Sequence, residues 1–350
     1  MKNYKGKTIY MGIDVHKNSY SISVLCDKVL VKRDKLAADP EALLEYCNKF
    51  KNSHIKSAYE AGFCGFYLHR FLLAHGIENI VVNPASIEIS SRDTVKTDKR
   101  DSLKIATQLA DGRLSCVYIP SVTREDKRNL TRLREQFVKQ KTRSACQIKS
   151  LLHLYGLIKP YTDPRVCEDW LIKILKLPVE KNCKFRLEKL VQTWRYFDLQ
   201  IKLTNKEIEK EAKEDYWLEA IYCSAPGIGP TTARKLINEL DDMSQFSNEE
   251  KLFNYAGLTP KEYSSGEHVR QGHISRQGKS IIRRLLVEAA WVAVKKDSSL
   301  AAIFEKLSYR AGKKRAIVAI ARILLGRIRT CIKEKRLYIM PVQEMARKVA

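Results

Sequence analysis

The alternation of apolar and polar residues over the first third of the chain predicts a β-sheet combined with helices. Three apolar segments near the N-terminus are separated only by short polar turns, which is typical of neighbouring antiparallel strands. Apolar residues at helical spacing, such as Phe66, Phe71 and Leu72, then lie between two further strand-like runs. The expected strands cover 8–15, 20–25, 29–33, 55–60 and 79–82, and the expected helices follow residue 40, span 65–75 and begin near 101.

The order of these elements narrows the fold class of residues 1–122. Three meandering strands followed by alternating helices and strands is the order of a ribonuclease H-like fold, in which helices cover both faces of a mixed sheet. The predicted class is therefore α/β, with the first strand in the centre of the sheet beside the fourth.

The middle of the chain, residues 123–215, predicts two long helices. Residues 124–149 hold nine Lys or Arg, three acidic residues and neither Gly nor Pro, which favours one continuous basic helix. In the second helix an apolar residue recurs every seven positions, at Leu187, Trp194, Ile201 and Ile208. This pattern fits an intramolecular helical hairpin and a dimerising coiled coil equally well, and both stay open.

The remaining residues, 216–350, predict a mainly helical third domain with a helix-hairpin-helix-like element near its start. Gly227 and Gly229 lie in the turn between two expected helices. These glycines fit a tight turn that needs positive φ, and they equally fit a loop that presents backbone N–H groups to a DNA phosphate.

The composition adds a strong positive charge. The 350 residues include 64 Lys and Arg against 40 Asp and Glu, a formal net charge of +24, which indicates a polyanionic partner. The longest nearly apolar stretch, 316–325, is too short to span a membrane. Nine scattered cysteines without a Cys-x-x-Cys pair indicate neither a disulfide framework nor a zinc ribbon. We expect a cytoplasmic protein with no membrane partner.

Four carboxylates are candidates for a metal site. Asp14 lies within the first expected strand and Glu60 at the end of the fourth, while Asp98 and Asp101 stand three apart where a helix begins. Neighbouring strands would bring Asp14 and Glu60 together, and the helix could carry the other two over them. Because clustered carboxylates repel one another, such a site requires divalent cations, and all-oxygen ligands favour Mg²⁺ or Mn²⁺. Two such ions could clamp the attacking and leaving oxygens of a phosphodiester transfer.

Each of these carboxylates also has a plainer interpretation. Asp98 or Asp101 could cap the helix, and an isolated Asp in a strand is often a turn or surface residue. Asp93 and Asp111 are alternative third and fourth ligands, although we expect them to be solvated loop or helix-end residues.

A basic segment near residue 270 is a second candidate site. Residues 269–284 contain five basic residues and no acidic one, which suits a nucleic-acid phosphate. Just before it, Ser264 and Ser265 precede a glycine and could be exposed as a nucleophile requires, although Ser-Ser-Gly is also common turn chemistry. The candidate nucleic-acid contacts are Gly227, Gly229, Arg270, Arg276, Lys279 and Arg283.

Two sets of motifs, in matching order along the chain, resemble those of the DEDD-type insertion-sequence transposases of the "one-ten" group. This family includes pilin-gene invertases and is also known as bridge-RNA-guided recombinases. The motifs similar to the family's RuvC-like domain are Gly12–Lys17, Tyr59–Ala61, Val82–Pro84 and Lys96–Asp101. The motifs similar to its transposase domain are Pro226–Gly229, Tyr255–Pro260, Ser265–Gly266 and Gly278–Lys279.

The resemblance implies a RuvC-like catalytic domain in which Asp14, Glu60, Asp98 and Asp101 bind the metal. It implies that Ser265 attacks DNA and forms a covalent 5′-phosphoserine link, with Ser264 as the neighbouring alternative. It further implies donor and target DNA as substrates, a structured bridge RNA that base-pairs with both, and a homo-oligomer, dimer to tetramer, formed through the central helices.

Two other functions fit the same residues. A RuvC-type endonuclease or junction resolvase would use the four carboxylates with water as its nucleophile, and Ser265 would be dispensable. In a nucleic-acid-binding protein without catalysis, the carboxylates would be structural. Asp14→Ala would then abolish neither cleavage nor strand exchange. The DNA recombinase ranks first and the endonuclease second. The architectural protein ranks well behind both, because it has no use for a buried four-carboxylate cluster.

Overall fold

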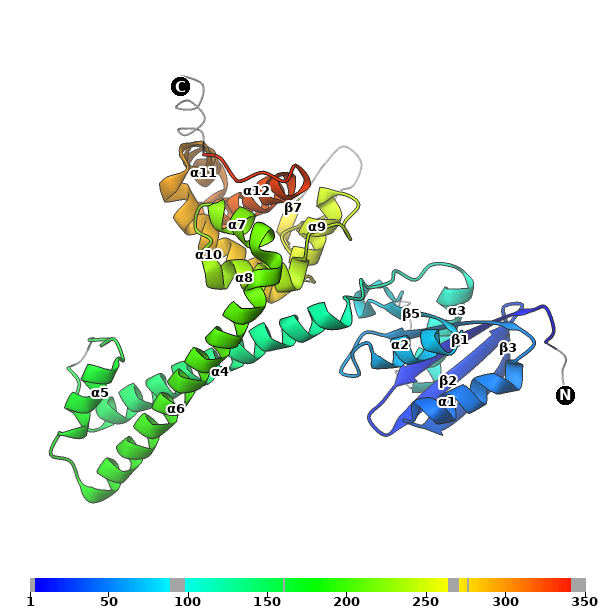
Figure 1. The fold of residues 1–350 in the computed structure, drawn as a ribbon, viewed down its shortest axis with the longest axis horizontal. Coiled ribbons are helices and arrows are strands. Elements are labelled where there is room, and N and C mark those ends of the chain that lie inside the picture. The colour runs from blue at the N-terminus through cyan, green and yellow to red at the C-terminus, as the bar shows by residue number, and fades with distance from the viewer. Residues whose placement is uncertain (1–3, 89–97, 160, 264–270, 276, 341–350) are drawn as a thin grey trace. The chain divides into compact units, whose positions relative to one another are not determined.

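The computed structural model describes residues 4–88, 98–159, 161–263, 271–275 and 277–340. The chain divides into two compact units, Met1–Ile119 and Pro120–Ala350. The first is a mixed α/β unit and the second is mainly helical (Figure 1). In the described residues, no helix is both long enough and apolar enough to cross a membrane.

The first unit is built on a five-stranded sheet, and all five expected strands are confirmed. The sheet order is β3-β2-β1-β4-β5, so the first strand is central and lies beside the fourth, as predicted. β1 runs antiparallel to β2 and parallel to β4. The strands are β1 (Thr8–Val15), β2 (Ser19–Cys26), β3 (Val29–Ala37), β4 (His54–Glu60) and β5 (Glu78–Val82).

Helices pack on both faces of this sheet. Ile9, Met11 and Ile13 of β1 share a buried cluster with apolar residues of α1 and α2. Because side chains alternate along a strand, the neighbouring positions of β1 face the other way, toward α3. The helical segments of this unit are α1 (Pro40–Cys47), η1 (Asn48–Phe50), α2 (Tyr67–Ala74), η2 (Pro84–Ser86) and α3 (Asp98–Ala110).

Two long helices open the second unit and form a hairpin within the chain. α4 (Val122–Leu154) and α6 (Lys181–Ala212) pack along each other, with α5 (Glu168–Leu175) between them in sequence (Figure 1). Leu187 and Trp194 are buried in the cluster that α6 shares with α4 and α5. The two expected helices are confirmed, and their heptad positions are filled from the same chain. A coiled coil between two copies stays a prediction.

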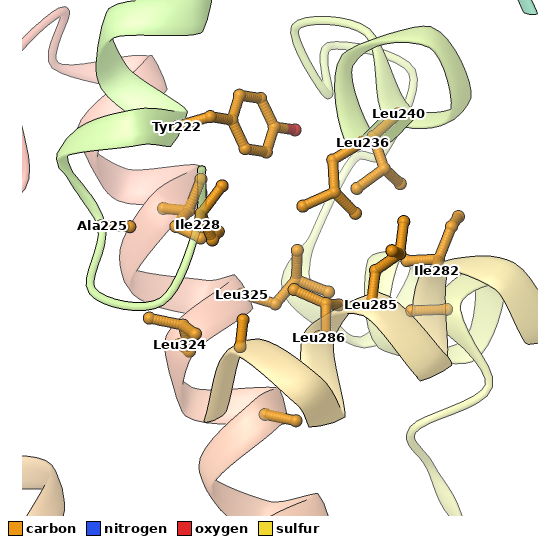
Figure 2. Close-up of a cluster of buried hydrophobic side chains, with 14 of the residues drawn as sticks. Tyr222, Ala225, Ile228, Leu236, Leu240, Ile282, Leu285, Leu286, Leu324 and Leu325 are labelled. Atoms are coloured by element: carbon orange, nitrogen blue, oxygen red, sulfur yellow. The ribbon is translucent and has the colours of Figure 1, made fainter. Parts of the chain in front are cut away.

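The rest of the second unit packs around one apolar core. Tyr222, Leu236, Leu286 and Leu325 meet there from four different helices (Figure 2). The elements are η3 (Lys213–Asp215), α7 (Tyr216–Ser224), α8 (Pro230–Leu240), α9 (Glu249–Ala256), β6 (Pro260–Glu262), β7 (Gln271–Ile274), α10 (Ser280–Lys296), α11 (Ser298–Ala311) and α12 (Lys313–Lys333). The antiparallel pair β6–β7 was not expected, because the sequence predicts only helices and turns in this region.

Charged residues, rather than apolar ones, join α4 to α8. Every residue of α8 from 233 to 240 is buried, including Arg234, Lys235 and Glu239. Arg132 of α4 pairs with Glu239 at 2.8 Å, and Glu135 of α4 pairs with Lys235 at 2.6 Å. Buried charges require such partners, so the basic first half of α4 is held against α8 by complementary charge.

Candidate active site

Asp14 and Glu60 lie at the carboxyl ends of neighbouring strands. β1 and β4 are parallel, and their register pairs Ile13 with Tyr59, so the next residues along the two strands are Asp14 and Glu60. In-register residues of adjacent strands point to the same face. The Asp14 side chain is half-buried and Glu60 is exposed. The predicted pairing of these two positions across the sheet is therefore present.

Gly12 lets α3 lie directly on this part of the sheet. A Cβ atom at Gly12 would come within 2.1 Å of the Ser102 carbonyl oxygen and 2.4 Å of the Ala106 nitrogen. Gly12 and Asp14 are two apart in β1 and so share a face. The Ser102 hydroxyl is 2.9 Å from that of Ser23, the residue paired with Gly12 on β2. α3 therefore crosses the same sheet face that carries Asp14.

The direction of α3 brings its N-terminus toward the carboxylates. Asp111, just after the helix, accepts hydrogen bonds from Lys28 and Arg113. Lys28 lies in the β2–β3 turn, beyond the end of β2 that pairs with the beginning of β1 at Ile9. The C-terminus of α3 is thus at the beginning of β1, and its first turn lies toward the end that carries Asp14. Asp111 is a helix-end residue, as expected.

The two remaining carboxylates belong to that first turn. Asp101 precedes Ile105 by one turn, and Ile105 packs with Ala58 of β4, two residues before Glu60. Lys104 is 3.7 Å from the Asp101 carboxylate. Asp98 begins the helix, but its side chain lies outside the described part, as does Asp93.

Among the described residues, the side chains at this end of the sheet do not form a complete metal site. Within the described ranges, no group of three or more His, Cys, Asp or Glu side chains is close enough to hold a metal ion. The donor chemistry still suits a hard divalent cation, since Asp14, Glu60 and Asp101 all offer carboxylate oxygens on elements that meet at one end of the sheet. The four-carboxylate metal site therefore stays a prediction, with the elements that carry Asp14, Glu60 and Asp101 meeting at one end of the sheet.

His16 is a neighbour that the sequence interpretation did not use. Its Nε2 lies 3.1 Å from a carboxylate oxygen of Asp14. The sequence could have indicated this contact. Asp14 and His16 are two residues apart at the end of β1, and residues two apart along a strand point to the same face.

The α7–α8 turn gives its two glycines different environments. Gly227 has a φ of +85°, and a Cβ atom there would come within 2.3 Å of the Ala289 carbonyl oxygen on α10. Turn geometry and close packing therefore both require glycine. Gly229 precedes α8, which has no side-chain cap, and nothing lies within 4 Å of the place a Cβ would take. The uncapped N–H groups of α8 are thus approachable at Gly229.

The β6–β7 pair brackets the candidate nucleophile in sequence. Ser264, Ser265 and Arg270 fall between these strands but lie outside the described residues, and so does Arg276. Beyond β7, the chain passes close to the C-terminal end of α9: a Cβ atom at Gly278 would come within 2.2 Å of the Gly257 nitrogen.

Two of the predicted nucleic-acid contacts, Lys279 and Arg283, lie near the C-terminal end of α9. Arg283 donates a 3.5 Å hydrogen bond to the Gly257 carbonyl. Partial burial lowers the pKa of the Lys279 ammonium group, and the charges of Arg132 and Arg128 lower it further against the opposing effect of Glu239. Burial is the largest of these effects, and an anion close to Lys279 would favour the charged form of its ammonium group.

Comparison with known proteins assigns this combination of units to the transposases. A family model described as "Transposase" matches residues 11–156, and one described as "Transposase IS116/IS110/IS902 family" matches residues 220–305. The chain belongs to this IS110-type transposase family, as the resemblance implied. Membership makes it an enzyme that cleaves and recombines DNA.

Relatives of this family span most of the chain. The transposase of insertion sequence IS1533 from Leptospira borgpetersenii is 26% identical, over 81% of this chain and 85% of the relative. The transposase of IS1111A from Coxiella burnetii is 26% identical, over 74% and 72%. The pilin gene-inverting protein of Moraxella bovis is 23% identical, over 96% and 99%.

Proposed function

We propose that this protein is a DNA transposase that cuts and rejoins strands through a serine, assisted by metal-binding carboxylates. The observation that carries the proposal is the register of β1 and β4, which puts Asp14 and Glu60 side by side where α3 begins above them. Family membership supplies the substrate class, DNA.

The fold of residues 1–122 is, on this proposal, that of a ribonuclease H- or RuvC-like domain. The central β1 beside β4 and the helices on both faces support it. Residues 123–215 would form the oligomerisation region and 216–350 the transposase domain that carries the serine. We also propose a cytoplasmic location, which suits a protein acting on DNA.

The four carboxylates Asp14, Glu60, Asp98 and Asp101 would hold Mg²⁺ or Mn²⁺. Bound there, the divalent ion supplies positive charge at the phosphate undergoing attack. Asp14 and Glu60 offer ligands from rigid strands, and the first turn of α3 brings the other two. His16, whose Nε2 lies 3.1 Å from the Asp14 carboxylate, would restrain its orientation.

Ser265 would be the nucleophile. Its Oγ attacks the phosphorus and forms a 5′-phosphoserine link, while the bond from phosphorus to the 3′ oxygen breaks and that oxygen takes a proton. Because serine is a poor nucleophile, it needs activation, and Arg276, Lys279 and Arg283 are available to stabilise the charge on the phosphate oxygens. A 3′-hydroxyl of the second DNA then reverses the step, so bond energy is conserved and no ATP is consumed.

Partners other than DNA follow from the resemblance. A structured bridge RNA would select donor and target sequences, and basic helices such as α4 offer it positive charge. A homo-oligomer, dimer to tetramer, would bring the carboxylates of one copy to the serine of another.

Hydrolysis by a RuvC-type endonuclease is the second candidate. It is favoured by the fact that Asp14, Glu60 and α3 all belong to the first unit, which could activate water without the serine. The products would then carry free ends, with no covalent protein–DNA intermediate.

Recombination between donor and target plasmids tests the proposal. Asp14→Asn and Glu60→Gln should each abolish it, and chelation of divalent metal should do the same to the wild type. Asp111→Asn is the matched control, because Asp111 also belongs to the α3 region but pairs with Lys28 and Arg113 at the far end of the helix. Full recombination by Asp14→Asn or Glu60→Gln would overturn the carboxylate assignment.

A further inference from the structure

The corner between α11 and α12 gathers five exposed cations around one exposed ring. We define the α11–α12 corner as Lys306, Tyr309, Arg310, Lys313, Lys314 and Arg315. All six residues are exposed, and Tyr309 is 97% exposed, with no aromatic partner in the described ranges. Such a fully exposed aromatic ring amid like charges is a candidate contact surface.

Among the described residues, the cations of the corner have no partner, unlike several cations elsewhere in the second unit. Arg124, Lys141 and Lys235 are each paired with a carboxylate. In the part of the chain that the structure describes, none of the five corner cations makes an ion pair or a side-chain hydrogen bond. Residues 306–333 include no Asp or Glu at all. The charge of the corner is therefore left for an external anion.

The first turn of α12 also breaks a local rule of helix stability. Three successive cations stand at its N-terminus, where the helix dipole favours negative charge, and no side chain caps it. α11, by contrast, is capped by Asp297. Conflicts of this kind are expected at functional sites. The exposed side chains of Lys313, Lys314 and Arg315 at this helix N-terminus form a surface suited to a phosphate.

Tyr309 indicates what kind of nucleic acid fits. Lys306, Tyr309 and Arg310 lie at i, i+3 and i+4 and so share one face of α11, which leads into the first turn of α12. An exposed ring beside phosphate-binding cations stacks on a base only where that base is unpaired, since bases within a duplex are stacked on one another. The geometry therefore favours a single strand over a duplex.

We propose that the α11–α12 corner binds an unpaired DNA strand, with phosphates at the first turn of α12 and a base stacked on Tyr309. DNA is the occupant because the chain belongs to a transposase family. The inference rests on the proposed function, in which attack by serine releases a strand with a free 3′-hydroxyl. Retention of that strand near the protein keeps it available for rejoining.

Binding of a labelled 20-nucleotide DNA strand to the full-length protein, followed by fluorescence anisotropy, tests the corner directly. Tyr309→Ala should weaken binding about tenfold, the loss expected for one stacked base, while Tyr309→Trp retains it. Tyr309→Ala and the wild type should bind a duplex of the same sequence with equal affinity.

The cations are tested by the salt dependence of the same binding. Joint replacement of Lys313, Lys314 and Arg315 by serine should lower the slope of log K against log salt by about 2, at roughly 0.7 for each lost phosphate contact. The matched control replaces three exposed α6 lysines, Lys181, Lys184 and Lys206, and should leave the slope unchanged.

Three outcomes overturn the inference: equal single-strand binding by Tyr309→Ala and the wild type, equal loss on single strand and duplex, or a loss seen only with an RNA strand of the same sequence. Failure of the proposed function is distinguishable, because Asp14→Asn would then leave recombination intact while single-strand binding at the corner could still be measured.

Discussion

Gly12 of β1 lies directly beneath Ser102 of α3, where a Cβ atom would approach the Ser102 carbonyl oxygen to 2.1 Å. This contact fixes the helix on the sheet face that carries Asp14, and it also sets the height of the first turn of α3 above the strands. The position of two of the four carboxylates therefore depends on a residue that has no side chain.

Gly12→Ala should lower the free energy of unfolding of the first unit by about 3 kcal/mol, because the added methyl group meets backbone atoms that cannot move aside independently. Chemical denaturation followed by circular dichroism measures this loss. Gly62→Ala is the control, since the nearest atom to its added Cβ, the Glu60 carbonyl oxygen, would lie at 3.8 Å. Equal unfolding midpoints for the two variants would show that α3 does not depend on this contact.

Substitution of the two glycines of the α7–α8 turn should separate effects on folding stability from effects on DNA binding. Gly227→Ala forces a Cβ onto a residue at φ +85° and against α10, so we expect a loss of roughly 2–3 kcal/mol in unfolding free energy. Gly229→Ala adds a methyl group in open space at the start of α8, so stability should change by less than about 1 kcal/mol.

The second measurement on the Gly227 and Gly229 variants is their affinity for duplex DNA. Gly229→Ala should bind duplex DNA several-fold more weakly, because the methyl group hinders a phosphate from reaching the N–H groups of α8. Unchanged affinity would leave Gly229 as a turn residue only.

Asp297 links the stability of the second unit to pH. Its carboxylate accepts hydrogen bonds from Tyr338 at 2.6 Å and from Arg327 at 3.2 Å, and it caps α11. Burial raises the pKa of Asp297, but these hydrogen bonds, one from Ser299 and the positive charge of Arg327 more than offset that effect, so the net pKa lies below its usual value. The stabilisation is therefore complete above about pH 4, the ordinary pKa of Asp, and is lost as pH falls through the lowered pKa.

Asp297→Asn should accordingly cost about 2 kcal/mol at pH 7, the range for hydrogen bonds to a charged group, and much less at pH 2. Unfolding free energies of variant and wild type at both pH values measure the difference. Asp163→Asn is the control, because the Asp163 side chain is 87% exposed and its pair with Lys149 is worth little. A difference independent of pH would contradict the charged role of Asp297.

Local pattern was sufficient to predict the sheet and the long helices. Alternation in 8–15 and the Gly-free run from 124 to 149 each specify one element without help from distant residues. The pairing of Asp14 with Glu60 followed from strand order, which sequence pattern also predicts. These parts of the fold depend on short-range periodicity.

Other features depend on partners far away in sequence. α8 carries Arg234, Lys235 and Glu239, which look like a solvated face, yet all are buried because their partners include Glu135 and Arg132, about 100 residues away. β6 and β7 are too short to show alternation, and β6 begins with a proline. The role of Gly227 in packing against Ala289 likewise required the tertiary contact.

The most direct test of serine recombination is detection of the covalent protein–DNA adduct. Full-length protein is incubated with end-labelled donor DNA and divalent metal, denatured, and the adduct is located by mass spectrometry. The account predicts a phosphoserine link at Ser265 that is absent in Ser265→Ala and retained in Ser264→Ala. Cleavage by the wild type that leaves only free DNA ends, or an adduct that survives Ser265→Ala, would contradict it.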